Sequence, residues 1–310
     1  MKKFGTNQSV KRVEDQSFLR GEGSFVSDIC PKNAVFVHFY RSPVAHAKIE
    51  NLSVDEATKS KGVLAVFTAH NLKDKLLNSM DFDLVINKNG KAAAAPTRPI
   101  LAENYVRFVG EAIAAVVANS KKAAEDAAEL IEIDFCEYDA HIKTEVGGPT
   151  IHQEAPDNKA VDWEFGDQAG TEKAFRDHPY EVTLNLIDNR VLPTPIETRV
   201  CFAECYGSEL HFCFAGQGVW KTRDALAKNL FMKKSQIRVT TPDVGGGFGM
   251  KAFDYPEYFI VALAAKELKT AVYWQAERRE GILSDNGGRD LVTEAKATFD
   301  TDYKLVAIRV

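Results

Sequence analysis

Short apolar runs alternate with polar breaks along most of the chain, and their lengths predict its secondary structure. The run 34–40 combines β-branched and aromatic residues, which is typical of a strand, and the fully apolar run 112–118 predicts a buried strand. The same pattern predicts strands over 49–52, 63–67, 131–135, 182–186, 200–205, 210–214, 237–241 and 271–275, and a hairpin of 292–299 with 304–310.

Segments of helical length lie between these strands. Residues 120–130 are rich in alanine, and 221–230 also has a helical pattern. Residues 255–268 carry apolar side chains on most faces, which predicts a buried helix. The SVDE sequence at 53–56 resembles a capping box that opens a helix through Lys59. Helices and strands are therefore mixed, and the predicted fold class is α+β.

Polar stretches divide the chain into four parts. We expect an extended N-terminal arm over 1–20, a first α+β domain over 21–138, a surface connector over 139–178 and a second α+β domain over 179–310. The chain ends at Val310 inside a predicted strand, so we expect a fragment, or a subunit that another chain completes.

Composition and charge narrow the functional classes. The chain has 310 residues, 45% of them hydrophobic, and a net charge of −5, which gives no reason to expect nucleic-acid binding. No apolar run approaches the roughly 18 residues of a membrane span, and the N-terminus has no signal-peptide core. Five cysteines without CxxC spacing predict free thiols in a cytoplasmic protein. Cys201 and Cys205 fall in a predicted strand, which disfavours a shared metal ion.

The strongest candidate for a binding site is a glycine-rich loop that follows the predicted strand 237–241. Four glycines, at 245, 246, 247 and 249, surround Phe248 and allow backbone to approach a ligand closely. A helix that starts directly after them would offer free N–H groups to an anionic ligand. The alternative is a tight strand-to-helix turn that binds nothing.

Gln217 lies in a second loop, between the strand 210–214 and the helix 221–230. Its amide can donate and accept hydrogen bonds, so it could hold an oxo ligand or a polarised substrate, although a solvated loop amide is equally consistent with the sequence. Four scattered histidines have no metal-ligand spacing, and no Ser–His–Asp pattern emerges. These histidines are His38, His46, His152 and His211.

The glycine loop also fits a nucleotide-binding pattern. Gly247 to Ala252 matches G-x-G-x-x-A, and Glu277 ends a later strand, where a ribose-binding acid would sit. However, Asp243 would place a carboxylate near the phosphates, and the segment QIRVTTPD lacks the apolar first strand of that fold. A nucleotide-binding dehydrogenase is therefore a third and weaker hypothesis.

Several long motifs follow one another in the order of one enzyme family. The first half contains FLRGEGSFVSDI, FYRSPVAHAKIENLSVDEA, GVLAVFTAHNL and LAENYVRFVGEAIAAVVANSKKAAEDAAELIEIDF. The second half contains NRVLPTPIETR, AGQGVWKTRDALAKNL, IRVTTPDVGGGFGMK and AERREGILSDNGGRDLVTEA. Together they resemble the N-terminal part of the molybdenum-cofactor-binding large subunit of the xanthine dehydrogenase / aldehyde oxidase / aerobic carbon monoxide dehydrogenase family. The resemblance implies an a/b hammerhead domain followed by the first, incomplete part of a molybdopterin-binding α+β domain.

The resemblance also implies a cofactor. This is a molybdopterin with molybdenum, often in a dinucleotide form, which supports hydroxylation of an aldehyde, N-heterocycle or similar small molecule with oxygen from water. Gln217 matches the family residue whose amide bonds a molybdenum oxo ligand, and Phe248 lies in the family's loop beside the metal. The cofactor-binding residues that the resemblance implies are Gln217, Gly246, Gly247, Phe248 and Gly249.

Three positions depart from the family pattern. Ala252 stands where xanthine-oxidising members have a substrate-binding Glu, which disfavours purine oxidation. Thr198 and Ala112 stand where the family usually has proline, and we expect these changes to affect backbone rigidity more than chemistry.

The family continues for several hundred residues beyond the length of this chain. We expect the general-base Glu and most pterin contacts to lie in that C-terminal part, so this chain holds no catalytic residue and is inactive alone. FAD and iron–sulfur subunits are expected as partners, because no cysteine pattern here can bind a cluster. The alternative is a non-catalytic assembly or scaffold subunit that keeps the fold without binding the cofactor.

Overall fold

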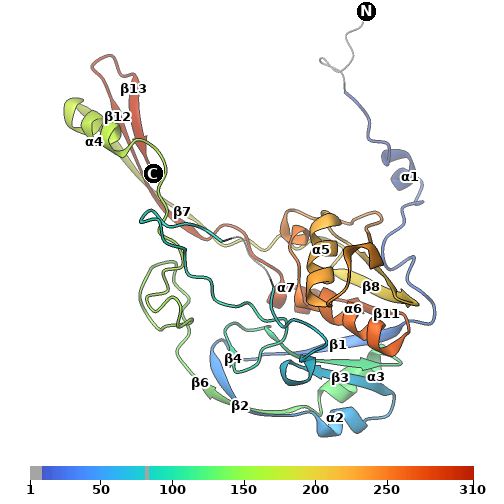
Figure 1. Cartoon of the computed structure of the whole chain (residues 1–310). Helices are drawn as coiled ribbons and strands as arrows, with labels where there is room; N and C mark the ends of the chain where they lie inside the picture. Colours follow the sequence, from blue (N-terminus) through green and yellow to red (C-terminus); the bar gives the residue numbers. More distant parts are fainter. Residues whose placement is uncertain (1–8, 81–83) are drawn as a thin grey trace, which may run out of the picture.

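A seven-stranded mixed sheet forms the centre of the computed structural model, which describes residues 9–80 and 84–310 (Figure 1). The strand order is β10-β9-β8-β11-β1-β5-β3. β1 pairs in parallel with β11, so the two halves of the chain share one sheet. The strands are β1 (Val35–Arg41), β3 (Val63–Thr68), β5 (Ala112–Ala118), β8 (Val200–Tyr206), β9 (Glu209–Phe214), β10 (Ile237–Thr240) and β11 (Val272–Gln275).

Helices cover both faces of this sheet, and β5 shows why its sequence is apolar throughout. Ala115 and Val117 pack into the core that includes α6 (Pro256–Leu268), whereas Ala114 and Val116 pack into the core that includes α3 (Lys121–Ala128). Alternate side chains of a strand point to opposite faces, so a strand between two helical layers needs apolar residues at every position. α2 (Asp55–Lys59) packs against β3, and α5 (Trp220–Asn229) against β10.

Two smaller sheets extend from this centre. One has the order β4-β2-β6, and the other has the order β13-β12-β7 and projects from the body beside α4 (Figure 1). No helix of the described residues is long and apolar enough to cross a membrane. These elements are β2 (Ala47–Ser53), β4 (Tyr105–Val106), β6 (Glu132–Glu137), β7 (Tyr180–Asp188), β12 (Leu291–Phe299), β13 (Leu305–Arg309) and α4 (Gln168–Asp177).

Most predicted strands and helices are confirmed, and the mixed α/β fold agrees with the predicted class. Three helices were missed: α1 (Asp15–Leu19) in the arm expected to be extended, α4 in the expected connector, and α7 (Arg278–Ser284). The predicted capping box of α2 is wrong, because Val54 occupies the N-cap position and no side chain bonds there. Short 3₁₀ turns complete the fold: η1 (Ala69–Leu72), η2 (Lys234–Gln236) and η3 (Met250–Ala252).

A buried ion network joins the two halves of the chain. The Arg199 side chain is fully buried before β8, and its Nη1 lies 2.6 Å from Oε2 of Glu257 in the first turn of α6. Arg41, at the end of β1, reaches the other oxygen of Glu257 at 2.5 Å. Arg199 also donates to Asp285, and Arg41 to Glu280. Three elements that are distant in sequence therefore meet at one carboxylate.

The charges in this network hold one another in the ionised state. Burial alone raises the pKa of Glu257, but Arg199 and Arg41 outweigh burial and lower the pKa to about 2. Burial acts to lower the pKa of Arg199, and the charge of Glu257 raises it above its ordinary value. Unpaired buried charges cost several kcal/mol each, so loss of one partner destabilises the rest.

Glu257 makes the folded state sensitive to acid. A carboxyl whose pKa falls from 4.5 to about 2 on folding stabilises the fold above pH 4.5. That contribution, about 3 kcal/mol, is lost as the pH falls toward 2. We expect the free energy of unfolding, measured by chemical denaturation, to decline over this range.

A Glu257→Gln variant tests the assignment. We expect it to be about 3–5 kcal/mol less stable at neutral pH, because two buried guanidinium groups lose their charged partner. We also expect it to lose much of the acid dependence. Glu56→Gln, which removes an exposed partner of Lys59, is the control and should keep the original pH profile. A Glu257→Gln profile with unchanged acid dependence would contradict the assignment.

Candidate functional site

The glycine loop lies between β10 and η3. Gly246, Phe248 and Gly249 all have positive φ angles, of 99°, 52° and 80°. A positive φ is uncommon for phenylalanine, and Phe248 is 70% exposed. The prediction of a helix directly after the glycines is wrong, because only the three-residue turn η3 follows and α6 begins at Pro256. Binding at a helix N-terminus is therefore not the basis of this site.

Gln217 and the glycine loop, which the sequence indicates as two separate candidates, lie against each other. Oε1 of Gln217 accepts a hydrogen bond from the N–H of Gly249 at 2.8 Å, and the backbone N–H of Gln217 donates to the carbonyl of Lys251 at 3.1 Å. A Cβ atom at Gly247 would lie 2.5 Å from Cδ of Gln217. Only glycine at position 247 therefore lets the Gln217 side chain rest on the loop.

Unused hydrogen-bond donors collect at this site. Because Oε1 of Gln217 is an acceptor, the Nε2 group is the donor end of the amide, and it has no partner among the described residues. The N–H groups of Gly246, Gly247 and Phe248 also have no partner within the described parts of the chain. Adjacent free N–H groups with an amide donor suit a ligand that carries oxygen or negative charge.

Two charged residues behind the loop were missed by sequence reasoning. Glu197 accepts from the N–H of Gly245 and from Nζ of Lys251. Both lie within motifs already recognised, Glu197 in NRVLPTPIETR and Lys251 at the end of IRVTTPDVGGGFGMK. That position was the only available signal, and it did not reveal that the two residues touch.

Asp243 bonds to the N-terminal segment of the chain. Its Oδ2 accepts from the N–H of Ser24 at 2.8 Å, and its N–H donates to the carbonyl of Ser24 at 3.0 Å. Val26 and Val244 pack in the same small core. The N-terminal segment therefore anchors the start of the glycine loop.

The other candidate residues do not join the site. Glu277 precedes α7, and its Oε1 accepts from Nζ of Lys121 at 2.7 Å. His211 lies between Glu204 and Thr240 at the sheet surface. Burial lowers the pKa of His38 and His152. The described residues contain no group of three or more His, Cys, Asp or Glu side chains that could hold a metal ion.

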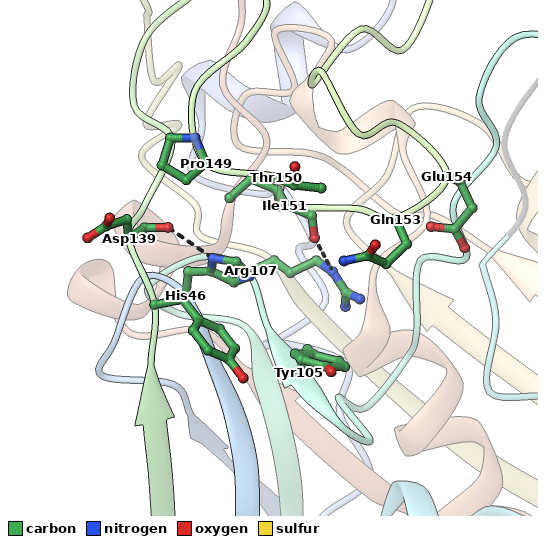
Figure 2. A pocket seen from close by; sticks show the side chains of 10 residues that line it. His46, Tyr105, Arg107, Asp139, Pro149, Thr150, Ile151, Gln153 and Glu154 are labelled. Carbon is green, nitrogen blue, oxygen red and sulfur yellow. Dashed lines mark hydrogen bonds between the residues drawn. The ribbon is translucent and has the colours of Figure 1, made fainter.

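A surface cavity of about 470 Å³ lies elsewhere, between β4, the end of β6 and the segment 149–154 (Figure 2). Arg107 crosses it, with Nε donating to the carbonyl of Ile151 at 3.4 Å, and Nδ1 of His46 lies 3.0 Å from the carbonyl oxygen of Asp139. None of its lining residues belongs to the glycine loop or its Gln217 neighbour. The cavity is therefore separate from the candidate site.

Comparison with known proteins connects this geometry to two domain families. Residues 20–139 match the a/b hammerhead domain of aldehyde oxidase and xanthine dehydrogenase. Residues 151–310 match the molybdopterin cofactor-binding domain. The second match contains Gln217 and the glycine loop, and it accounts for more than half of the chain.

Individual relatives agree. The nicotine 6-hydroxylase large subunit of Paenarthrobacter nicotinovorans is 31% identical over 97% of this chain and 37% of its own length. The structure of quinoline 2-oxidoreductase from Pseudomonas putida 86 matches with a TM-score of 0.82 and 29% identity, over 97% of this chain and 38% of its own. Cu,Mo-CO dehydrogenase matches with a TM-score of 0.84 and 27% identity, over 97% and 39%. The chain thus spans less than two fifths of each of these proteins.

Two glycine variants are expected to act differently on Gln217. Gly247→Ala would push the Gln217 side chain off the loop, because the new methyl group overlaps Cδ. Gly249→Ala meets no atom within 4 Å and should only strain the backbone at its positive φ, at a cost of about 1 kcal/mol.

NMR of the Gln217 side-chain amide separates the two effects. We expect its signals to shift strongly in Gly247→Ala and only slightly in Gly249→Ala, with both proteins folded. Equal shifts in the two variants would contradict the close contact at position 247.

Proposed function

Because the chain belongs to the xanthine dehydrogenase / aldehyde oxidase / carbon monoxide dehydrogenase family of molybdopterin-binding proteins, we propose that it supplies part of the molybdenum pocket of a hydroxylase. The observation that carries this proposal is the set of unused donors at one place, the Gln217 amide and the N–H groups of 246–248. When bound, molybdopterin with molybdenum supplies two-electron oxidation and hydroxylation with oxygen from water.

The roles of the chain's own residues follow from their positions. The Nε2 group of Gln217 would donate to an oxygen of the bound group, and the hydrogen bond to Gly249 keeps that donor oriented. The N–H groups of Gly246, Gly247 and Phe248 would offset negative charge. The exposed Phe248 ring would limit the access of water on that side. None of these residues can accept a proton, and we propose that the general base lies in the remaining part of the subunit.

Position 252 bears on the substrate. Ala252 is exposed beside the glycine loop and carries no group that can bond a purine. The nicotine hydroxylase and quinoline oxidoreductase relatives make an N-heterocycle the substrate class to test first, followed by aldehydes. Neither Gln217 nor the loop distinguishes molybdopterin itself from its dinucleotide form, and we propose that any nucleotide contacts lie in the remaining part of the subunit.

The projecting sheet suggests where that remaining part binds. One of its faces is apolar and about half exposed, with Leu184 at 53%. Antiparallel partners share a face, and Leu184 pairs with Ala295. α4 packs on the opposite face, where Phe175 lies against Arg309. The apolar residues of the uncovered face, here called the arm face, are Val182, Leu184, Leu186, Ala295, Ala297 and Ile308, and Thr293 lies among them as the partner of Leu186.

We propose that the arm face packs against the C-terminal part of the molybdenum subunit, as one chain or a separate one. Neighbouring apolar side chains that are about half exposed are typical of an interaction site, and the relatives are more than twice as long as the matched segment. FAD and iron–sulfur subunits would carry the electrons onward, and the free thiols fit a cytoplasmic location. The alternative is an assembly or scaffold subunit with the same partners and no cofactor.

Molybdenum and pterin content tests the main proposal. We expect neither in the chain purified alone, and both after co-expression with the C-terminal part, because the pocket needs donors from both. Gln217→Ala should lower the molybdenum content of the complex, whereas Gln153→Ala, an exposed glutamine at the separate cavity, should not. A complex without molybdenum would support the scaffold alternative. Oxidation of an N-heterocycle or aldehyde by the isolated chain would contradict the incomplete pocket.

Neighbouring substitutions on β7 test the arm face. Leu184→Lys places a charge on it, whereas Asn185→Lys places the same charge on the opposite face of the strand. We expect Leu184→Lys to weaken binding of the C-terminal part at least about tenfold, the equivalent of about 1.4 kcal/mol, with little change in the melting temperature. Equal binding by the two variants would exclude the arm face as the contact.

A further inference from the structure

We propose that the buried ion pair of Glu197 and Lys251, here called the loop clamp, is the positioning element that sets the shape of the glycine loop and the direction of the Gln217 amide. The link to cofactor binding rests on the proposed function above. The geometric part concerns this chain alone and can be tested without any cofactor.

One carboxylate oxygen holds both ends of the loop. Oε2 of Glu197 accepts from the N–H of Gly245 at 2.8 Å and from Nζ of Lys251 at 2.9 Å. The backbone N–H of Glu197 donates to the carbonyl of Gly245 at 3.2 Å. Gly245 begins the loop and Lys251 follows it, so their separation is set by contact with a single atom.

The clamp extends to Gln217 through the backbone of Lys251. The carbonyl of Lys251 accepts the backbone N–H of Gln217 at 3.1 Å, and Oε1 of Gln217 accepts from Gly249 at 2.8 Å. The contacts form a closed path from Glu197 through Lys251 and Gln217 back into the loop. A shift of Lys251 would therefore turn the amide donor of Gln217 away from its position.

Glu197 is itself held from a different element. Nη1 and Nη2 of Arg278, at the start of α7, donate to the carbonyls of Pro195 and Ile196, each at 2.7 Å. These two bonds restrain the segment before Glu197, so its carboxylate is held in place from a second element. Among described residues, Glu197 is the side chain that bonds to both ends of the glycine loop.

Stability alone does not explain a charged pair at this place. The Lys251 side chain is 0% exposed and that of Glu197 is 12% exposed. Burial lowers the pKa of Lys251, because holding a charge away from water is unfavourable. Oε1 of Glu197 is buried and has no hydrogen-bond partner among the described residues. An apolar pair could be equally stable, but it could not accept a hydrogen bond from the N–H of Gly245. The distinct contribution of the charged pair is therefore to fix the direction of this hydrogen bond.

Hydrogen exchange of the 310-residue chain tests the clamp. Glu197→Asp keeps the charge but shortens the reach to the loop, and Glu197→Gln keeps the reach but removes the charge. We expect exchange in the segments 215–219 and 245–251 to rise about tenfold in Glu197→Asp, with a smaller rise in Glu197→Gln, while exchange in β5 stays unchanged. Glu56→Asp and Lys122→Met, in exposed ion pairs, are the matched controls and should change neither region.

A double variant separates positioning from charge balance. Lys251→Met leaves Glu197 buried without its cation, and adding Glu197→Gln removes that unpaired charge. We expect the double variant to recover much of the melting temperature that Lys251→Met loses, while exchange in the loop stays fast. Recovery of loop protection together with stability would show a merely structural pair and overturn the proposal. Unchanged loop exchange in Glu197→Asp would also overturn it.

The molybdenum content of the complex then tests the link to cofactor binding, independently of hydrogen exchange. In the complex with the C-terminal part, Glu197→Asp should lower molybdenum content relative to Glu56→Asp. If the unaltered complex contains no molybdenum but its loop loosens in Glu197→Asp, the proposed function fails while the clamp stands. The other outcome is an unaltered complex that contains molybdenum and a Glu197→Asp complex that contains as much, although its loop is loosened. In that case the clamp has no role in cofactor binding, and that part of the inference is wrong.

Discussion

One buried carboxylate, that of Glu257, is the contact on which the rest of the structure depends. Arg41 comes from the first half of the chain and Arg199 from the second, and both bond to it. Charges removed from water must be paired closely, so the ends of β1, β8 and α6 have little freedom to separate. The shared seven-stranded sheet is consistent with this constraint, because β1 and β11 come from the two halves of the chain and pair directly.

The network also reaches the back of the candidate site. The guanidinium of Arg199 lies 3.9 Å from the centre of the Tyr255 ring, and the Tyr255 hydroxyl donates to the carbonyl of Met250, directly after the glycine loop. The loop is therefore held from behind by the central core and by Glu197. Its front, with Phe248 and the Gln217 amide, is open. A supported back and an open front are the features on which the proposed molybdenum pocket rests, and the chain spans less than two fifths of its relatives.

The elements that sequence pattern predicted well are those whose burial follows from local composition. β5 is apolar and buried along its whole length, and α6 is buried from Glu257 to Ala265, mostly by apolar side chains. The sequence pattern did not predict α4. This helix has no buried residue, so its sequence contains no apolar stripe that would indicate a helix. It packs against β13, with Arg309 over Phe175, a contact between residues far apart in the chain. The polar segment therefore resembled a connector.

Local information was enough for the fold class, for most strands and for the two loops that hold Gln217 and Phe248, because glycine content and strand periodicity act within a few residues. It could not show that these loops touch, since the contact of Gly247 with Gln217 joins segments about thirty residues apart. Nor could it reveal the charged pair of Glu197 and Lys251. A buried charge is distinguishable from a solvated one only after folding, when its distant partner and the absence of water are both present.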